Sequence, residues 1–371
     1  MTSSRSLWRQ FDFVLLALTL LLTFFGILMI ASTTRGAIDP DLINRVPDQI
    51  RYAGIGVLVM FVLAALDYRL LGGIHQWLYL LMVGLLLLVQ AFGFEGEAGS
   101  QSWINLGFIR LQPSEIAKIL IIITLGHYLA QNYHKMDSIA TVIKSGLHIA
   151  IPTALILIQP DLGMTIVFAV LWLTMVWAAG LRLKHIATFL LVLSISAPLT
   201  LPLAWASMEP YQRSRITSFI LPESDPDAYY NILQARISIG NGGMFGLGYT
   251  YGTQNRWRFL RVRHTDYIFA VIAEEFGFVG GMTVMSLLAA VILRILRGAR
   301  LAIDPLGSLI CYGVASFIFF QTVVSIGMNL SLLPVTGLTL PFISSGGTSL
   351  LSTLMGVGLV ESVLMRARRT A

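Results

Sequence analysis

The feature that most constrains this chain is a series of apolar runs, most of them 15 to 22 residues long. A helix needs about 20 apolar residues to cross the hydrocarbon core of a bilayer, and runs of this length and uniformity do not suit barrel strands. Only 12% of the residues are charged and 56% are hydrophobic, whereas about one quarter of a soluble domain is charged. We therefore expect an all-α integral membrane protein.

The runs predict a polytopic bundle of ten transmembrane helices that forms one domain over residues 1–371. The expected spans lie near residues 13–31, 51–66, 76–94, 114–130, 142–158, 161–180, 186–206, 267–296, 307–328 and 346–365. Proline cannot continue helical hydrogen bonding, so the break at Gln159, Pro160 and Asp161 predicts a tight hairpin turn. The first run is longer than a signal peptide requires, and we interpret it as an uncleaved anchor. The lone Cys311 permits no intrachain disulfide.

The distribution of positive charge predicts the orientation. With both termini in the cytoplasm, the cytoplasmic segments hold thirteen lysines and arginines, against four in the opposite short segments, namely Arg35, Arg45, Arg51 and Arg110. A large loop, about residues 207–265, then lies on the extracytoplasmic side between helices 7 and 8. It carries seven arginines and no lysine, and since long loops escape the charge rule, another reason for these arginines is needed.

Arginines and aromatic rings together suggest what this loop binds. A guanidinium donates two parallel hydrogen bonds to a phosphate, and the rings could cover the face of a sugar, which favours a phosphorylated, glycosylated lipid. The alternative is that the arginines bind ordinary anionic headgroups and the rings form an interfacial belt. The glycines at 240, 242, 243, 246 and 248 indicate a loop or a bent strand, and they are weak evidence for a phosphate cradle.

Several charged residues lie within or beside the expected spans. Glu115 and Lys118 are three residues apart after Pro113, so they share a helix face and can pair. Such a pair either holds helices together or faces a substrate in a water-filled cavity. Asp161 is favoured as the cap of the helix that follows it. Glu274 could share a face with Asp266 or lie at the membrane surface.

His264, Thr265 and Asp266 join the arginine-rich loop to the next span. Taken alone, Thr265 or Asp266 is favoured as the cap of that helix. A carboxylate at the mouth of a cationic, aromatic cavity could instead accept a proton from a sugar hydroxyl while arginines hold a phosphate leaving group. The chain shows no nucleotide-binding glycine motif, no His and Cys cluster with metal-ligand spacing and no Ser-His-Asp order, and nothing in it points to nucleic acid.

Six motifs together resemble one family along the whole chain. They are Leu111 to Lys118 (LQPSEIAK), Gln159 to Gly163 (QPDLG), Tyr211 to Arg215 (YQRSR), His264 to Gly277 (HTDYIFAVIAEEFG), Leu333 to Gly337 (LPVTG) and Pro341 to Gly347 (PFISSGG). In this order they resemble the SEDS proteins, named for shape, elongation, division and sporulation. The junction from Val262 to Asp266 is more similar to the RodA-like elongation branch than to the FtsW-like division branch.

The resemblance implies a peptidoglycan glycosyltransferase in the bacterial cytoplasmic membrane. Such an enzyme polymerises lipid II, a disaccharide-pentapeptide on undecaprenyl pyrophosphate, at the outer membrane face during elongation and shape maintenance. It works with a class B penicillin-binding protein and other elongation machinery. The essential aspartate of the family falls on Asp266, and its other important polar positions fall on Glu115, Lys118, Asp161, Gln212, Arg215 and the turn Ser344, Ser345, Gly346 and Gly347. Ser345 departs from the family, because many members have tyrosine there.

The substrate chemistry that the resemblance implies needs one inversion at a sugar carbon. By analogy with inverting glycosidases, a single base activates the acceptor hydroxyl opposite the leaving group. We expect Asp266 to be that base, and we expect Lys118 and the loop arginines Arg213 and Arg215 to bind pyrophosphate, with Gln212 and His264 beside them. Alternatively, Asp266 could hold a divalent cation, Mg²⁺ or Mn²⁺, against the pyrophosphate.

Two functions of other classes stay open at the level of sequence. A lipid II flippase would also have ten spans, broken helices and a cationic cavity, but it would make no polymer. A non-catalytic scaffold for the penicillin-binding protein would not depend on the chemistry of the loop. Glycines in spans eight and nine, at 277, 280, 281, 307 and 313, could receive a partner helix, although internal packing is the favoured interpretation.

Overall fold

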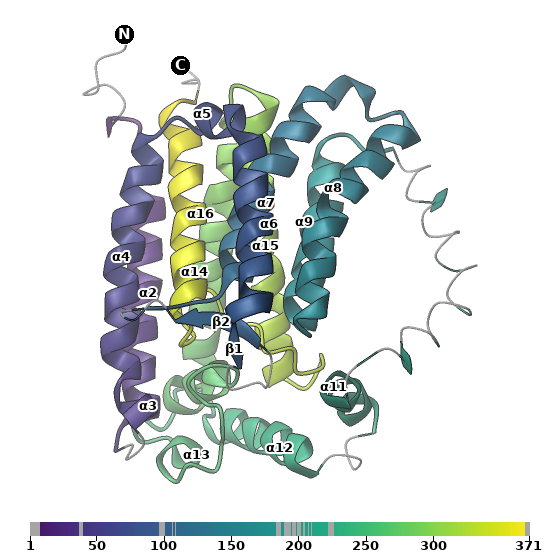
Figure 1. Cartoon of the computed structure of the whole chain (residues 1–371). Coiled ribbons are helices and arrows are strands. Elements are labelled where there is room, and N and C mark those ends of the chain that lie inside the picture. Colours follow the sequence, from purple (N-terminus) through teal and green to yellow (C-terminus); the bar gives the residue numbers. More distant parts are fainter. Residues whose placement is uncertain are drawn as a thin grey trace.

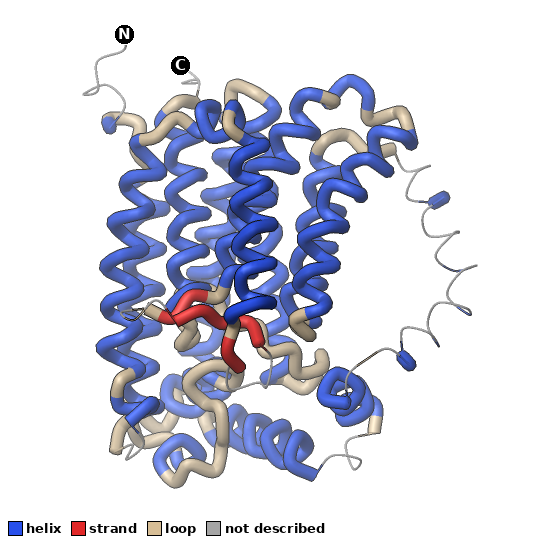
Figure 2. Tube along the Cα trace, viewed as in Figure 1, coloured by secondary structure: helices blue, strands red, loops and turns tan. Residues whose placement is uncertain are grey.

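The computed structural model is a helical bundle with a layer of short helices and strands at one end (Figures 1 and 2). It describes residues 8–36, 40–95, 101–105, 107, 109–182, 187–188, 194, 198, 202, 205–206, 208, 210–221 and 226–367, with the side chains of 40, 41, 95, 101, 210–212, 215, 227 and 228 left out. Figure 1 shows that the first and last helices, α2 and α16, have their chain-terminal ends at the same end of the bundle.

Eight described helices are long and apolar enough to cross a membrane. They are α2 (Phe13–Thr34), α4 (Arg45–Ala65), α6 (His75–Phe92), α7 (Pro113–Gln131), α8 (Ile139–Ile158), α14 (Ile268–Leu301), α15 (Pro305–Asn329) and α16 (Gly347–Met365). Together with the shorter apolar α9 (Leu162–Ala178) they match nine of the expected spans. The expected span at 186–206 lies largely outside the described residues. The expected break at 159–161 separates α8 from α9, which pack together, so the hairpin is confirmed.

The remaining elements are short and lie mostly beyond the ends of these helices. The long loop contains α11 (Pro210–Ile220), α12 (Pro226–Asn241) and α13 (Thr253–Arg256), and α3 (Pro40–Ile43) precedes α4 at the same end (Figure 1). Between α6 and α7, the strands β1 (Phe94–Glu95), β2 (Gln101–Asn105) and β3 (Arg110–Leu111) form an antiparallel sheet in the order β1-β2-β3. The opposite end carries α5 (Tyr68–Gly73) and a 3-10 turn (Tyr133–Lys135).

Three helices form the interior of the bundle. The apolar windows of α7, α15 and α16 are 78%, 78% and 94% buried, whereas those of the other spans are at most 39% buried. Small residues let α4 and α16 approach closely, because a Cβ at Gly358 would lie 2.6 Å from the carbonyl oxygen of Met60. The interior is therefore built around α16, whose first turn reaches the end that carries the strands.

An ion pair lies within this interior. The Nζ of Lys118 is 2.7 Å from a carboxylate oxygen of Glu115, and the Lys118 side chain is fully buried. Ser352 of α16 donates to the same carboxylate oxygen at 2.8 Å, and the Lys118 Nζ lies 4.3 Å from the centre of the Phe317 ring of α15. The pairing expected from the spacing is confirmed, and it connects α7 with both other inner helices.

A second constraint is a break in α14 at Gly277. This residue has φ of 69° and ψ of −166°, so the chain is extended there. In a continuous helix, the N–H groups of Phe278 and Val279 would reach the carbonyls of Glu274 and Glu275. Instead they donate to the carbonyls of Gly243 and Met244 of the long loop, at 2.8 and 3.1 Å.

The loop in turn donates hydrogen bonds to the carbonyls of α14 that the break leaves without their helical partners. The N–H groups of Leu247 and Gly248 donate to the carbonyls of Glu274 and Glu275, at 3.0 and 2.9 Å. We call the loop segment 242–248 and the break at Gly277 together the loop lock. A Cβ at Gly246 would lie 2.2 Å from the carbonyl oxygen of Glu275, which explains a glycine at that position. Four of the glycines that were weak evidence for a phosphate cradle, at 242, 243, 246 and 248, therefore lie in a backbone junction, whereas Gly240 belongs to α12 and not to a loop or strand.

The two glutamates of the loop lock also hold the loop through their side chains. Glu274 accepts hydrogen bonds from Ser238, Thr253 and the N–H of Gln254, at 3.0, 3.0 and 2.9 Å. Glu275 accepts from Ser32 at 2.5 Å and Asn255 at 2.9 Å. Both are almost fully buried, so Glu274 does not lie at the membrane surface, which was one of its two expected positions. A buried carboxylate needs such partners.

Internal packing also accounts for the other glycines considered for a partner helix. A Cβ would lie 2.9 Å from Ile122 at Gly313, 3.0 Å from the Tyr68 hydroxyl at Gly307 and 3.5 Å from Phe269 at Gly281. At Gly280 it would meet Phe276 of the same helix at 2.2 Å.

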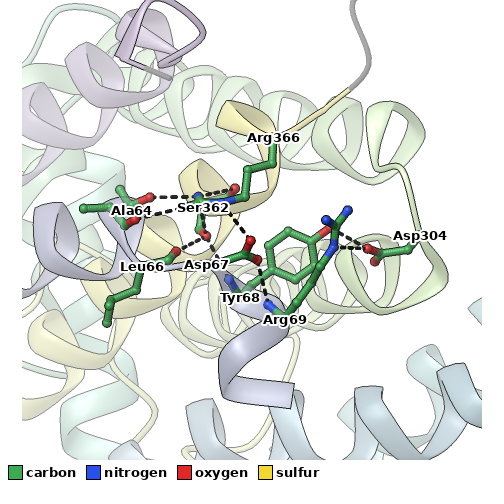
Figure 3. A network of polar contacts seen from close by, with 9 residues as sticks. Ala64, Leu66, Asp67, Tyr68, Arg69, Asp304, Ser362 and Arg366 are labelled. Atoms are coloured by element: carbon green, nitrogen blue, oxygen red, sulfur yellow. Dashed lines mark hydrogen bonds and ion pairs between the residues drawn. The ribbon is translucent and has the colours of Figure 1, made fainter. Parts of the chain in front are cut away.

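A polar network ties the helix ends at the far end of the bundle (Figure 3). Arg366 donates to the main-chain carbonyls of Ala64 and Ala65, at 3.2 and 2.7 Å, which are acceptors left over at the end of α4. Asp304 accepts from Arg69 at 2.7 Å and Tyr68 at 2.8 Å. Burial alone would raise the pKa of Asp304, but the N–H of Gly307, Arg69 and Tyr68 together hold this pKa below its usual value. This network fixes α4, α5, α15 and α16 relative to one another.

We expect Lys118→Met to lower the free energy of unfolding by about 3–5 kcal/mol, because it leaves the buried Glu115 carboxylate without a cation. The double variant Glu115→Gln with Lys118→Met should recover most of this loss. Thermal unfolding of the detergent-solubilised protein measures both effects. If the single variant is as stable as the double variant, the ion pair does not constrain the interior.

We expect Gly246→Val to open the loop lock. The left-handed backbone costs an L residue about 1–2 kcal/mol, and the clash with Glu275 adds to it, so the loss should be about 2 kcal/mol or more. Limited proteolysis should then cut the loop faster than in the wild type. Gly240→Ala is the control, since nothing lies within 4 Å of a Cβ there. Equal protease resistance of both variants would contradict the loop lock.

Candidate functional site

A cavity of about 670 Å³ opens at the end of the bundle that carries the strands and loop helices. This volume is within the range of ligand pockets, about 300–1,000 Å³. Its walls come from α4, the three strands, the start of α7, the turn before α9, the junction before α14 and the turn before α16. The charged residues that line it are Arg45, Asp48, Arg51, Arg110, Glu115, Asp161 and Asp266.

Asp266 is held in this wall through its main chain. The helix α14 begins at Ile268 with Tyr267 as its cap residue and without a side-chain cap, so capping by Thr265 or Asp266 is wrong. Asn329 of α15 takes this place: it donates to the carbonyl of Asp266 at 2.8 Å and accepts from the N–H of Ala270 at 3.0 Å. The Asp266 side chain is therefore not used as a cap.

The turn before α16 holds the same junction from the other side. Ser344 is buried and its hydroxyl donates to the carbonyl of Thr265 at 2.7 Å. The N–H of Ser345 donates to the carbonyl of His264 at 2.9 Å. Ser345 and Gly346 line the cavity, whereas Ser344 is not among its lining residues. Of the expected site residues in this turn, Ser345 and Gly346 thus form part of the cavity wall, whereas Ser344 positions the junction that contains Asp266.

His264 lies behind the cavity wall. Its side chain is 7% exposed and is not among the lining residues. Burial, followed by the charges of Arg45 and Arg263, lowers the pKa of His264 to about 4. The imidazole is therefore neutral at physiological pH and cannot supply a positive charge to a phosphate. In this structure it is part of the support of the junction.

Two further carboxylates of the wall have structural partners. Asp161 caps α9 by accepting from the N–H of Met164 at 3.0 Å, so its expected capping role is confirmed. Its other oxygen accepts from Gln112 at 3.2 Å. Glu115 lines the cavity while Lys118 lies fully buried behind it. Lys118 therefore does not form part of the cavity wall, contrary to its expected contact with pyrophosphate.

The cavity arginines are not those expected from the loop. No loop arginine whose side chain the structure describes is among the lining residues. Arg213 donates to the carbonyl of Ala206 at 2.7 Å, Arg263 donates to the carbonyl of Thr33 at 2.8 Å, and Arg261 lies 5.7 Å from the centre of the Tyr230 ring. The side chains of Gln212 and Arg215 lie outside what the structure describes, although α11 contains both residues.

The arginines that line the cavity instead come from short segments that do not belong to the long loop. Arg45 and Arg51 belong to the first turns of α4, and Arg110 belongs to β3. The sequence contained a signal for them. Together with Arg35, these three arginines are the positive charges in the short segments predicted to be extracytoplasmic, where the charge rule predicts few. The wall contributed by β1, β2 and β3 was missed altogether, because β1 and β3 have two residues each and β2 has five, which is too short for a clear alternating pattern.

Comparisons with known proteins agree with this architecture. The chain matches the FTSW_RODA_SPOVE model, described as cell cycle protein, over residues 12–369. It is 36% identical to the peptidoglycan glycosyltransferase MrdB of Escherichia coli K12, covering 93% of this chain and 92% of that protein. It is 35% identical to the stage V sporulation protein E of Bacillus subtilis, with 96% and 98% covered. Other relatives carry the names RodA and FtsW.

Solved structures show the same fold. One is a chain of a peptidoglycan synthase complex that coordinates polymerization and crosslinking, with a TM-score of 0.78, 31% identity, and 95% of this chain and 97% of that chain covered. Another is the rod shape determining protein RodA of Thermus thermophilus, with a TM-score of 0.68, 28% identity, and 97% and 98% covered. On the match over nearly its whole length, this multi-pass membrane protein belongs to the FtsW, RodA and SpoVE family of cell cycle proteins.

Proposed function

We propose that this chain is a peptidoglycan glycosyltransferase that polymerises lipid II into glycan strands during cell elongation and shape maintenance. The observation that carries this function is a cavity with Asp266 in one wall and three arginines in others, in a chain whose relatives are named peptidoglycan glycosyltransferases. One carboxylate and several cations are the groups that an inverting transfer from a pyrophosphate requires.

In the proposed reaction, the 4-hydroxyl oxygen of an acceptor sugar attacks the anomeric carbon of the donor. The bond from that carbon to the pyrophosphate oxygen breaks, and polyprenyl pyrophosphate leaves with the bonding electrons. The hydroxyl proton goes to the carboxylate of Asp266. Attack opposite the leaving group converts an α linkage into a β linkage in one displacement, so one base is sufficient.

Of the four carboxylates that line the cavity, we assign the role of base to Asp266, on which the essential aspartate of the resembled family falls. Asp48 is paired with Arg51. Glu115 is paired with Lys118 and accepts from Ser352, and Asp161 caps α9. A cation or hydrogen-bond donors stabilise a carboxylate and lower its basicity. The carbonyl of Asp266 accepts a hydrogen bond from Asn329, which holds this residue in the cavity wall. Glu115 and Asp161 then serve substrate binding in the wall.

The leaving group is assigned to Arg45, Arg51 and Arg110 rather than to the loop arginines. All three line the cavity, and guanidinium groups bind phosphate oxygens through paired hydrogen bonds. Pyrophosphate leaves as a stabilised anion, so positive charge is more useful there than a general acid. Arg51 pairs with Asp48 in the structure, and a substrate phosphate would compete with that exposed partner.

A divalent cation, Mg²⁺ or Mn²⁺, is a further part of the proposal. These cations prefer oxygen ligands, and the Asp266 carboxylate supplies them. In the described part of the chain no group of three or more His, Cys, Asp or Glu side chains could hold a metal ion. The donor set thus fits a cation only together with phosphate oxygens of the substrate. When bound, the cation would neutralise charge on the pyrophosphate.

The orientation and partner are likewise proposals. The strands β1 and β2, whose residues line the cavity, lie toward the bundle end opposite to the chain-terminal ends of α2 and α16 (Figure 1). The excess of lysine and arginine in the segments at that far end supports cytoplasmic termini and a cavity on the outer face of the bacterial membrane. The likeness to a chain of a synthase complex supports a class B penicillin-binding protein as the partner.

We expect Asp266→Asn to lower the polymerisation rate by about 10²–10⁴, the usual contribution of a general base, without changing thermal stability. Purified protein is given lipid II, and both glycan polymer and released polyprenyl pyrophosphate are measured. Asp137→Asn, at the far end of the bundle, is the matched control. Full polymerisation by Asp266→Asn would reject the base assignment, and a wild type that moves lipid II without releasing pyrophosphate would reject the enzyme.

We also expect EDTA to lower the initial rate of the wild type and added Mg²⁺ or Mn²⁺ to restore it. Metal analysis of substrate-free protein should find less than one divalent ion per chain, since the protein alone offers too few ligands. A rate unaffected by EDTA would leave Asp266 as a base without a cation partner and would reject the cation proposal.

A further inference from the structure

One face of the three-stranded sheet forms a wall of the cavity. In the antiparallel pairing, Phe94 lies opposite Trp103 and Asn105 lies opposite Arg110. Residues two apart on a strand share a face, so Trp103 and Asn105 point to the same side as their partners across the strands. All four line the cavity. This face therefore presents an aromatic pair next to a polar pair.

The sheet is fixed to the bundle beside this face. The Tyr52 hydroxyl of α4 donates to the carbonyl of Arg110 at 2.5 Å and is 2.7 Å from the N–H of the same residue, which donates to it. Thr348 of α16 donates to the Arg110 carbonyl at 3.0 Å and accepts from the N–H of Gln112 at 3.2 Å. Two transmembrane helices thus hold β3, and β3 holds β2 through the ladder.

The chemistry of this face suits a sugar ring better than a hydrocarbon chain. An indole face attracts the C–H groups of a ring that lies flat on it. The Trp103 side chain is partly buried, so its orientation is constrained. Asn105, Arg110 and the cavity carboxylates around it offer partners for hydroxyl and amide groups at the edge of a sugar. A polyprenyl tail has no such edge, and these polar groups would lose their solvation against it.

We propose that Trp103, supported by Phe94, is the platform on which a hexosamine ring of the lipid-linked substrate stacks, and that it decides whether the cavity prefers a glycosylated over an unglycosylated polyprenyl pyrophosphate. This inference rests on the proposed function. It divides the cavity by chemistry: Arg45, Arg51 and Arg110 receive phosphate, Trp103 with Phe94 receives a sugar, and Asp266 lies where the two parts of the substrate join.

The test compares two probes that differ only in the sugar. Binding of undecaprenyl pyrophosphate carrying the disaccharide-pentapeptide, and of undecaprenyl pyrophosphate alone, is measured on the detergent-solubilised full chain. We expect Trp103→Ala to weaken binding of the glycosylated probe about tenfold and to leave binding of the bare probe unchanged. Trp103→Tyr, which keeps a ring, should recover most of the loss. Arg51→Gln should weaken the binding of both probes.

Trp257→Ala is the matched control, because this exposed tryptophan of the long loop is not among the lining residues. It should bind both probes like the wild type. The platform is rejected if Trp103→Ala binds the glycosylated probe as tightly as the wild type does, or if it weakens both probes equally. Binding is measured without turnover, so a wild type that does not polymerise lipid II rejects the proposed function separately.

Discussion

The buried ion pair between Glu115 and Lys118 is the interaction on which the rest of the bundle depends. Removing a charge from water costs several kcal/mol even after the protein relaxes around it. The two side chains can therefore be buried only in an arrangement in which they form an ion pair. Lys118 has no exposed surface, and Ser352 completes the shell around Glu115. This requirement fixes the rotation of α7 against α16 and places Glu115 at the cavity wall.

The site depends equally on contacts between main-chain groups and distant side chains. Asn329 holds the carbonyl of Asp266, and Ser344 holds that of Thr265. Asn329 also accepts from the N–H of Ala270, and this supplies an acceptor that the first turn of α14 would otherwise need. Asp266 lines the cavity although it lies next to a helix start, where a carboxylate is commonly used as a cap. Positioning and chemistry are assigned to different residues.

Local patterns in the sequence predict those parts of the structure that depend on interactions between residues close together in the chain. Apolar runs of about 20 residues predict the described spans, the break at Pro160 predicts the hairpin, and the spacing of Glu115 and Lys118 predicts their pairing. The start of α4 was placed at residue 51 rather than Arg45, because its first turns carry charges that face the cavity. Asn329 lies about sixty residues from the junction that it holds, and no local pattern reveals such a contact. Composition also does not show which way a side chain points, so the sequence does not reveal that Arg213 donates to the carbonyl of Ala206 and is not among the lining residues.

The break at Gly277 has a consequence for how this protein can be assembled. If α14 were continuous, the N–H groups of Phe278 and Val279 would donate to the carbonyls of Glu274 and Glu275. The main chain of the loop would then form hydrogen bonds with water. Insertion of the loop therefore replaces hydrogen bonds within α14 by hydrogen bonds to the loop, and these four main-chain groups of α14 keep a partner. A newly inserted α14 can cross the bilayer as an unbroken helix, as lipid requires, and open only when residues 242–248 arrive. The last step in the folding of this end of the bundle would then be a substitution of hydrogen-bond partners within an existing helix.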